Sequence, residues 1–129
     1  MKIRSFFFFF LVFFLFFAAS APAKHKHKER YYQDLWCAER GGISEYRLPN
    51  GKRVDCLTKT HAIEFDFGAK AYEGAAQAQY YAIKTGRSPG VALIMSKADW
   101  RLGKDQIVLD IFEPLGSVYP GFKLWTMEE

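Results

Sequence analysis

The segment from Ala62 to Phe67 alternates in polarity, and this alternation limits the structures that it can adopt. Successive side chains of a β-strand point to opposite faces of a sheet. A strand here places two carboxylates on one face and three large apolar side chains on the other: Glu64 and Asp66 against Ile63, Phe65 and Phe67. The sequence therefore predicts a strand with one acidic and one apolar face.

A third carboxylate, Asp55, lies in the preceding predicted strand. We expect Asp55, Glu64 and Asp66 to converge at one edge of a small sheet. Burying unpaired charges is costly, whereas carboxylate oxygens are ligands that Mg²⁺ prefers. The pattern indicates a Mg²⁺ or Mn²⁺ site in a metal-dependent phosphodiester hydrolase. The alternative is a set of weak surface ion pairs on an edge strand, with Arg47, Arg53, Lys59 or Lys70 as partners.

Residues 1–23 have the three-part pattern of a secretory signal peptide. Lys2 and Arg4 precede an unbroken apolar run of twelve residues, Phe6 to Phe17, and small residues follow as far as Ala23. We expect cleavage after Ala23, a periplasmic or secreted protein, and no stable membrane association afterwards. An uncleaved membrane anchor of about 18 residues is the alternative.

The chain from Lys24 onward has 106 residues, the size of one compact domain. The leader contains two of the 18 Lys and Arg residues, so 16 basic residues face 14 acidic ones and the net charge is +2. Any phosphate-binding surface must therefore be a local patch. Cys37 and Cys56 predict a disulfide in an exported chain. A zinc site with His61, or two reduced thiols, are the alternatives.

Residues 24–28 predict a basic linker, and residues 29–129 a single domain. The helical spacing of Tyr32, Leu35 and Trp36 predicts a helix from Glu29 to about Arg40. Three strands are expected next, at 43–48, 53–58 and 62–67, with a hairpin turn at Asn50-Gly51 between the first two.

From Ala69 to about Lys84 the sequence predicts a helix ended by Gly86. Its expected packing stripe consists of Tyr72, Ala76, Tyr80 and Ile83, and its polar stripe of Lys70, Glu73, Gln77, Tyr81 and Lys84. A buried central strand follows at 91–95. Residues 105–112 are predicted as helix or strand, ended by Pro114 and Gly116, and residues 122–127 as a last strand.

The order helix, three strands, helix, strand over residues 29–95 resembles the restriction-endonuclease-like core of the PD-(D/E)XK nuclease superfamily. The run from Trp36 through Tyr81 also resembles small, exported, uncharacterised bacterial proteins assigned to it. The resemblance implies a mixed α/β sheet with a C-terminal helix and strand extension. It also implies that Asp55, on the second strand, and Glu64, on the third, bind Mg²⁺ or Mn²⁺.

Further roles follow from this resemblance. Glu45 lies where family members often carry a Glu ahead of these strands, and Gln77 with Tyr81 matches the Gln-x-x-x-Tyr motif of the family. Asp66 is a further candidate metal ligand, or a carboxylate partner for Lys70. The implied catalytic residues are Asp55, Glu64, Lys70 and Gln77. Lys52, Arg53 and Lys84 are the implied contacts to nucleic acid, DNA rather than RNA, and such contacts make binding salt-dependent.

The chain departs from the family pattern beside the third-strand acid. Family members usually carry Lys two residues after it, where this chain has Asp66, and Lys70 on the following helix is the replacement that we expect. A Pro that often precedes the first Asp is replaced by Val54. Two other functions stay open: a non-catalytic nucleic-acid- or protein-binding module of the same fold, and a disulfide-stapled periplasmic protein whose carboxylates bind a structural cation.

Overall fold

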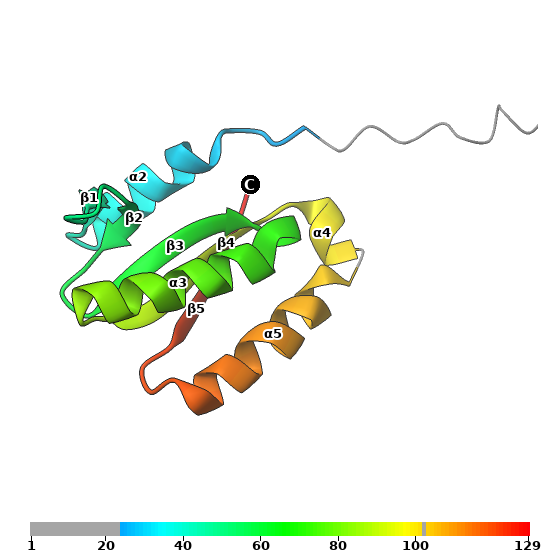
Figure 1. Cartoon of the computed structure of the whole chain (residues 1–129). Helices are drawn as coiled ribbons and strands as arrows, with labels where there is room; N and C mark the ends of the chain where they lie inside the picture. The colour runs from blue at the N-terminus through cyan, green and yellow to red at the C-terminus, as the bar shows by residue number, and fades with distance from the viewer. Residues whose placement is uncertain (1–23, 102) are drawn as a thin grey trace, which may run out of the picture.

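The computed structural model describes residues 24–101 and 103–129, so the predicted signal peptide lies outside the described residues (Figure 1). These ranges form a mixed five-stranded sheet with four helices. In chain order the elements are α2 (Glu29–Glu39), β1 (Ile43–Arg47), β2 (Arg53–Leu57), β3 (His61–Phe67), the 3₁₀ turn η1 (Gly68–Lys70), α3 (Ala71–Thr85), β4 (Ser88–Met95), α4 (Lys97–Arg101), α5 (Lys104–Val118) and β5 (Lys123–Glu128). The predicted α/β class is confirmed. None of the described helices is long and apolar enough to cross a bilayer.

The sheet has the strand order β1-β2-β3-β4-β5. The first three strands form an antiparallel meander, whereas β3, β4 and β5 run parallel. β3 pairs with β4 along its whole length, but it pairs with β2 only at Cys56↔Ile63 and Leu57↔Ala62. Beyond that point β2 keeps its pairing with β1 alone. The meander therefore opens at Asp55, and the acidic residues lie at this opening.

Helices cover both faces of the sheet. On one face, Trp36 of α2 packs against Ile63 and Phe65 of β3. On the other face, α3 and α5 pack against β4 through one cluster, whose buried residues are Ala71, Ala75, Ala78, Val91, Leu93, Met95 and Phe112. β3 is thus a central strand, buried on both sides. The alternative of carboxylates on an exposed edge strand is wrong, because α3 covers the face that carries Glu64 and Asp66.

The buried face of α2 differs from the predicted one at Leu35, which is 54% exposed. Its buried residues are Tyr32, Gln33, Trp36 and Cys37. Cys37 is joined to Cys56 of β2 with an S–S distance of 2.07 Å. The predicted disulfide is therefore present, and because both sulfur atoms are used, the zinc site with His61 is excluded.

The packing face of α3 is also not the predicted one. Tyr72 and Ile83 are 72% and 80% exposed. The residues that face the sheet are mostly small: Ala71, Gly74, Ala75, Ala78, Tyr81 and Ala82. A Cβ atom on Gly74 would lie 3.4 Å from the Cβ of Asp66. The helix approaches the sheet too closely for large side chains, and Tyr81, predicted in the polar stripe, is buried.

The α5 helix continues to Val118 through Pro114 and Gly116, which were predicted to end it. Proline removes one hydrogen bond, to the carbonyl four residues earlier. Here that carbonyl belongs to Asp110, and both Asp110 and Pro114 are exposed. Water can therefore replace the missing donor, and the packing of Phe112 against the core keeps the helix in place.

The basic segment 24–28 is exposed and lies against the domain at two points. The ring of His25 stacks on Phe67 at 3.5 Å between centroids and contacts the Glu129 carboxylate. The ring of His27 stacks on Tyr31 at 4.1 Å. These contacts bring the segment to the end of β3, next to the start of α2.

Candidate active site

Asp55 and Glu64 meet where β2 separates from β3. The backbone N–H of Phe65 donates a hydrogen bond to Asp55 Oδ2 at 2.8 Å, and the N–H of Asp55 donates to Glu64 Oε1 at 3.3 Å. Carboxylate oxygens thus accept from backbone groups that a regular ladder would pair with carbonyls. The opening of the sheet is what brings the two carboxylates together.

Burial dominates the electrostatics of this pair. Glu64 is 3% exposed, and burial, followed by repulsion from Asp55, raises its pKa well above the usual range. Burial also raises the pKa of Asp55, although the N–H of Phe65 opposes this shift. Two such carboxyl groups cannot both be ionised cheaply. In the absence of a cation, the pair retains a proton at neutral pH.

Asp66 lies next to this pair, beneath α3. Its exposed fraction is 6%, and its carboxylate makes no hydrogen bond or ion pair with any residue in the described ranges. Burial, followed by repulsion from Glu29, raises the pKa of Asp66 to about 7, and the ammonium of Lys70 opposes this. Asp66 thus lies close enough to Glu64 to raise the pKa of that residue, but within the described residues the three acids do not form a group that could hold a metal ion.

Gln33 of α2 was not predicted as part of the site. It is buried, and its Nε2 donates to the backbone carbonyl of Asp55 at 2.8 Å, to Ser44 Oγ at 3.1 Å and to Glu45 Oε1 at 3.2 Å. Gln33 therefore holds the backbone of Asp55 from the α2 side. Its position four residues before Cys37 places it on the buried face of the helix, which is the signal that reveals it in the sequence.

Glu45 is held by basic residues. Arg53 Nη1 lies 2.7 Å from Oε2 of Glu45, and Arg30 Nη1 lies 3.2 Å from Oε1. The backbone of Glu45 has a φ of 54°, in the left-handed region that residues other than glycine rarely adopt. Glu45 thus orients two cationic side chains near Asp55. Both carboxylate oxygens of Glu45 are already paired with arginines.

The two predicted helper residues, Lys70 and Gln77, are both exposed. Lys70 is exposed on η1, and its charge acts on Asp66 and Glu29. Gln77 is exposed and donates to Glu73 Oε1 at 3.3 Å. By contrast, Tyr81 is buried, and burial followed by the charges of Glu64 and Asp55 raises its pKa. Of the two residues in the Gln-x-x-x-Tyr match, only Tyr81 faces the carboxylate pair.

Two of the three predicted nucleic-acid contacts converge on one ring. The ammonium groups of Lys52 and Lys84 lie 4.8 Å and 5.7 Å from the centroid of Tyr80. Asn50 Nδ2 donates to the hydroxyl of Tyr80 at 2.8 Å and anchors this ring to the β1–β2 turn. The third predicted residue, Arg53, remains about half exposed although it pairs with Glu45.

The carboxylate oxygens of this site suit a hard cation that also binds water or other oxygen ligands. Within residues 24–101 and 103–129, no three His, Cys, Asp or Glu side chains form a ready-made metal cage. Mg²⁺ is usually bound by one or two carboxylates together with water and substrate phosphates. Asp55 and Glu64 supply two neighbouring carboxylates, with Asp66 beside them. Two carboxylates fit Mg²⁺ or Mn²⁺ when water or another oxygen donor completes the shell.

The buried carboxyl groups predict that the metal-free protein becomes less stable as the pH rises. Unfolded Asp and Glu lose their protons near pH 4, whereas the folded state keeps them up to about pH 7 at Asp66. Between these values the folded state binds more protons, so the free energy of unfolding falls with increasing pH. From about pH 5 to about pH 8 we expect a loss of roughly 2–4 kcal/mol, since one unit of pKa corresponds to about 1.4 kcal/mol.

Urea unfolding in EDTA at the two pH values measures this difference, and added Mg²⁺ is expected to reduce it. A protein that is as stable or more stable at the higher pH would contradict the assignment of these groups as proton-holding carboxyls.

Comparison with known proteins adds no relative from which a role can be transferred. No protein-family model, no curated protein sequence and no solved structure matches this chain. The role of the site must therefore be inferred from its own geometry: a half-buried Asp55 and a buried Glu64, joined by a hydrogen bond where β2 and β3 separate.

Proposed function

We propose that this protein is a divalent-metal-dependent nuclease that hydrolyses phosphodiester bonds, in DNA rather than RNA. The observation that carries the proposal is the hydrogen bond from the Asp55 N–H to the buried Glu64 carboxylate, which brings the two acidic residues together. The element order and the mixed sheet are consistent with the restriction-endonuclease-like core that the sequence resembles.

The residues around the pair have distinct tasks in this proposal. Asp55 and Glu64 hold Mg²⁺ or Mn²⁺, and Asp66 adds negative charge beside them. When bound, the ion stabilises charge on a phosphoryl group and makes water more acidic. Gln33 fixes the backbone of Asp55, so that its carboxylate stays aligned with Glu64. Lys70, which is exposed, is the group that meets the phosphate or orients water.

The nucleic acid approaches from the side of the β1–β2 turn. Lys52 and Lys84 share the ring of Tyr80 there, and Arg53 connects this surface to the carboxylates through Glu45. Basic side chains of this kind contact phosphates and position a strand without reading its sequence. The proposed path thus leads from the cationic rim to the acidic pair.

We also propose that the protein acts outside the cytoplasm. The leader has the pattern of a cleaved signal peptide, and the Cys37–Cys56 disulfide is of the kind that persists in oxidising compartments. A periplasmic or secreted nuclease accounts for both features.

A second function, a non-catalytic module that binds nucleic acid or protein, is favoured by one observation. Both predicted helper residues are exposed: Lys70 acts on Asp66 and Glu29, and Gln77 is hydrogen-bonded to Glu73. Since the family usually places a Lys directly beside the third-strand acid, a site without that neighbour can bind a cation and a strand without cleaving it.

Cleavage of plasmid and linear DNA by the purified protein, with Mg²⁺, Mn²⁺ or EDTA, tests the proposal. We expect cleavage with either metal, none in EDTA, and loss of both cleavage and calorimetric metal uptake in Asp55→Asn. Asp110→Asn, an exposed change on α5, is the matched control and should behave as wild type. Metal uptake and DNA binding without cleavage would favour the non-catalytic module, and no metal uptake would refute both.

A further inference from the structure

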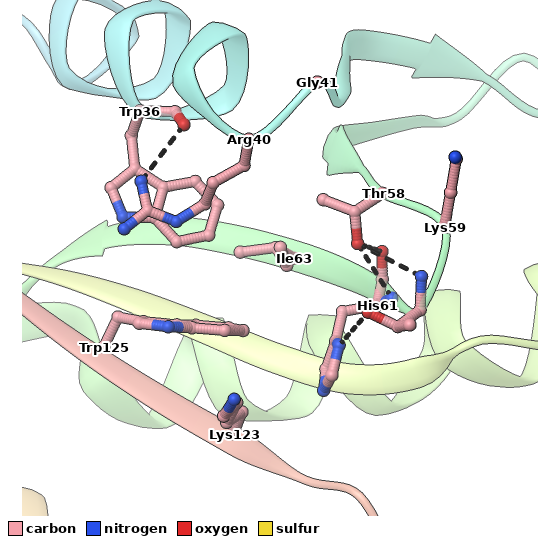
Figure 2. Close-up of a pocket in the computed structure, with 10 residues that line it drawn as sticks. Trp36, Arg40, Gly41, Thr58, Lys59, His61, Ile63, Lys123 and Trp125 are labelled. Atoms are coloured by element: carbon pink, nitrogen blue, oxygen red, sulfur yellow. Dashed lines mark hydrogen bonds between the residues drawn. The ribbon is translucent and has the colours of Figure 1, made fainter.

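A cavity of about 450 Å³ opens on the α2 face of the sheet. Figure 2 shows it between the C-terminal end of α2, the turn that joins β2 to β3, and β5. Ile63 of β3 lines it, and Ile63 and Glu64 point to opposite faces because they are successive residues of one strand. The cavity is therefore separate from the carboxylate pair, and its volume is in the range of small-molecule sites.

The described residues that line this cavity are basic, aromatic or neutral. The charged ones are Arg40, Lys59 and Lys123, which come from three different parts of the fold. Arg40 Nη1 lies 3.5 Å from the carboxylate of Glu39. Lys59 and Lys123 form no ion pair with any residue of the described ranges. Both lysines are exposed, and their charges favour an anionic ligand at this cavity.

The aromatic wall of the cavity is fixed in place. The Trp36 and Trp125 rings meet edge to face with centroids 5.1 Å apart, and His61 meets Trp125 in the same way at 5.5 Å. His61 is held at both nitrogens, by Thr60 Oγ1 and by the carbonyl of Gly121, each at 2.8 Å. A flat ligand therefore finds this wall preformed.

Gly90 makes room for this wall. A Cβ atom there would come within 2.8 Å of Cζ3 of Trp125. Two cations already lie over the indoles: the guanidinium of Arg40 is 3.7 Å from the Trp36 ring, and the ammonium of Lys123 is 5.7 Å from the Trp125 ring. The cavity thus combines aromatic surfaces with basic groups, the combination that proteins use to hold a base and its phosphate.

We propose that this cavity binds a nucleotide, with the base against the Trp125 indole, since Arg40 covers the Trp36 ring, and with the phosphate at the basic side chains. The choice of a nucleotide over other aromatic anions rests on the proposed function. A free nucleotide and one nucleotide of a single strand share this chemistry, and the experiment separates them. In a nuclease, such a site on the opposite face of the sheet would hold a strand away from the scissile bond.

The test is fluorescence anisotropy of a labelled thymidine decanucleotide in EDTA, with unlabelled thymidine monophosphate as competitor. We expect Lys59→Gln/Lys123→Gln to weaken binding about tenfold at low salt and to reduce the salt slope by about 0.7 for each phosphate that is no longer neutralised. The charge-matched control, Lys97→Gln/Arg101→Gln on α4, should bind as wild type. Trp125→Leu should also weaken binding.

If the monophosphate displaces the labelled decanucleotide, the cavity binds a free nucleotide. If only an unlabelled strand displaces it, the cavity binds a nucleotide within a single strand. If the wild type binds neither, or the control loses as much affinity as the cavity variant, the proposal is overturned. Because the assay contains EDTA and measures binding alone, its outcome does not depend on metal-supported cleavage, and failure at this cavity is distinguishable from failure of the metal site.

Discussion

Replacing Glu64 by Gln is expected to abolish metal-dependent cleavage while leaving the fold as stable as wild type at neutral pH. Burial and repulsion from Asp55 raise the pKa of Glu64, so the metal-free protein already holds this side chain in a neutral form. Glutamine has nearly the same shape, and its carbonyl oxygen can accept the hydrogen bond from the N–H of Asp55. What it cannot supply is an anionic ligand.

We expect the cleavage rate of Glu64→Gln to fall at least about 100-fold, because even residues that merely support metal ligands cost roughly 10–100-fold in affinity or activity. The free energy of unfolding in EDTA should change by less than about 1 kcal/mol, since the hydrogen bond is retained. Initial rates on DNA and urea unfolding at neutral pH measure the two quantities. Glu113→Gln, an exposed change on α5, is the control.

Opposite results have a clear meaning. If the Glu64→Gln protein cleaves at the wild-type rate, Glu64 is not a ligand of the catalytic metal. One that unfolds shows that the ionised carboxylate has a structural task, which would argue against a proton-sharing pair.

Removal of the disulfide is expected to have the largest effect on stability. Cys37 and Cys56 are separated by 19 residues, and opening a loop of this length costs about 3 kcal/mol. For a domain of this size the midpoint of thermal unfolding should fall by about 10 °C or more. The bond also joins α2 to β2, so Gln33 should hold the Asp55 carbonyl less firmly, and cleavage should weaken with stability.

Thermal unfolding of Cys37→Ala/Cys56→Ala, measured by circular dichroism, tests this expectation. Wild type treated with a thiol reductant should match the double variant, and the reductant should not change the variant itself. A midpoint that moves by less than about 3 °C in both cases would show that packing between α2 and the sheet suffices without the bond.

Several features of the fold could be predicted from local patterns. Alternation identified β3, the Asn50-Gly51 turn identified the β1–β2 hairpin, and the cysteine pair identified the disulfide. Alternation and turn residues depend on neighbours in sequence, and the disulfide depends on the presence of two cysteines. The tertiary structure retains all three features. The approach of Asp55 to Glu64 has the same basis, because the two residues lie on neighbouring strands, whereas the predicted metal site of three acids remains a prediction.

Features that depend on long-range packing could not be predicted in this way. The large apolar residues Tyr72 and Ile83 suggested a packing face for α3, but the close approach of Gly74 to Asp66 selects the small residues instead. The same approach decides that Glu64 is buried rather than exposed, which alternation alone leaves open. The position of α3 over the sheet therefore determines that the carboxylates are buried.

The continuation of α5 and the role of Gln33 also lay beyond local rules. Pro114 breaks helices in general, yet its position on the exposed side of α5 makes the missing hydrogen bond harmless. Gln33 resembles an ordinary helix residue until α2 is placed on the β1–β2 hairpin, where its amide finds three acceptors. Solvent decides the outcome at Pro114, and acceptors distant in sequence decide it at Gln33.

The small-residue contact of α3 has a consequence for how this protein can change over generations. Where Ala and Gly meet a sheet, the layers lie close together, and side chains much larger than a methyl group displace the helix. Its outer side, with Tyr72 and Ile83, carries no such restriction. Substitutions should therefore be tolerated on the outer side of α3 and mostly destabilising on the side that faces the sheet. The outer side can change without disturbing the acidic residues beneath the helix.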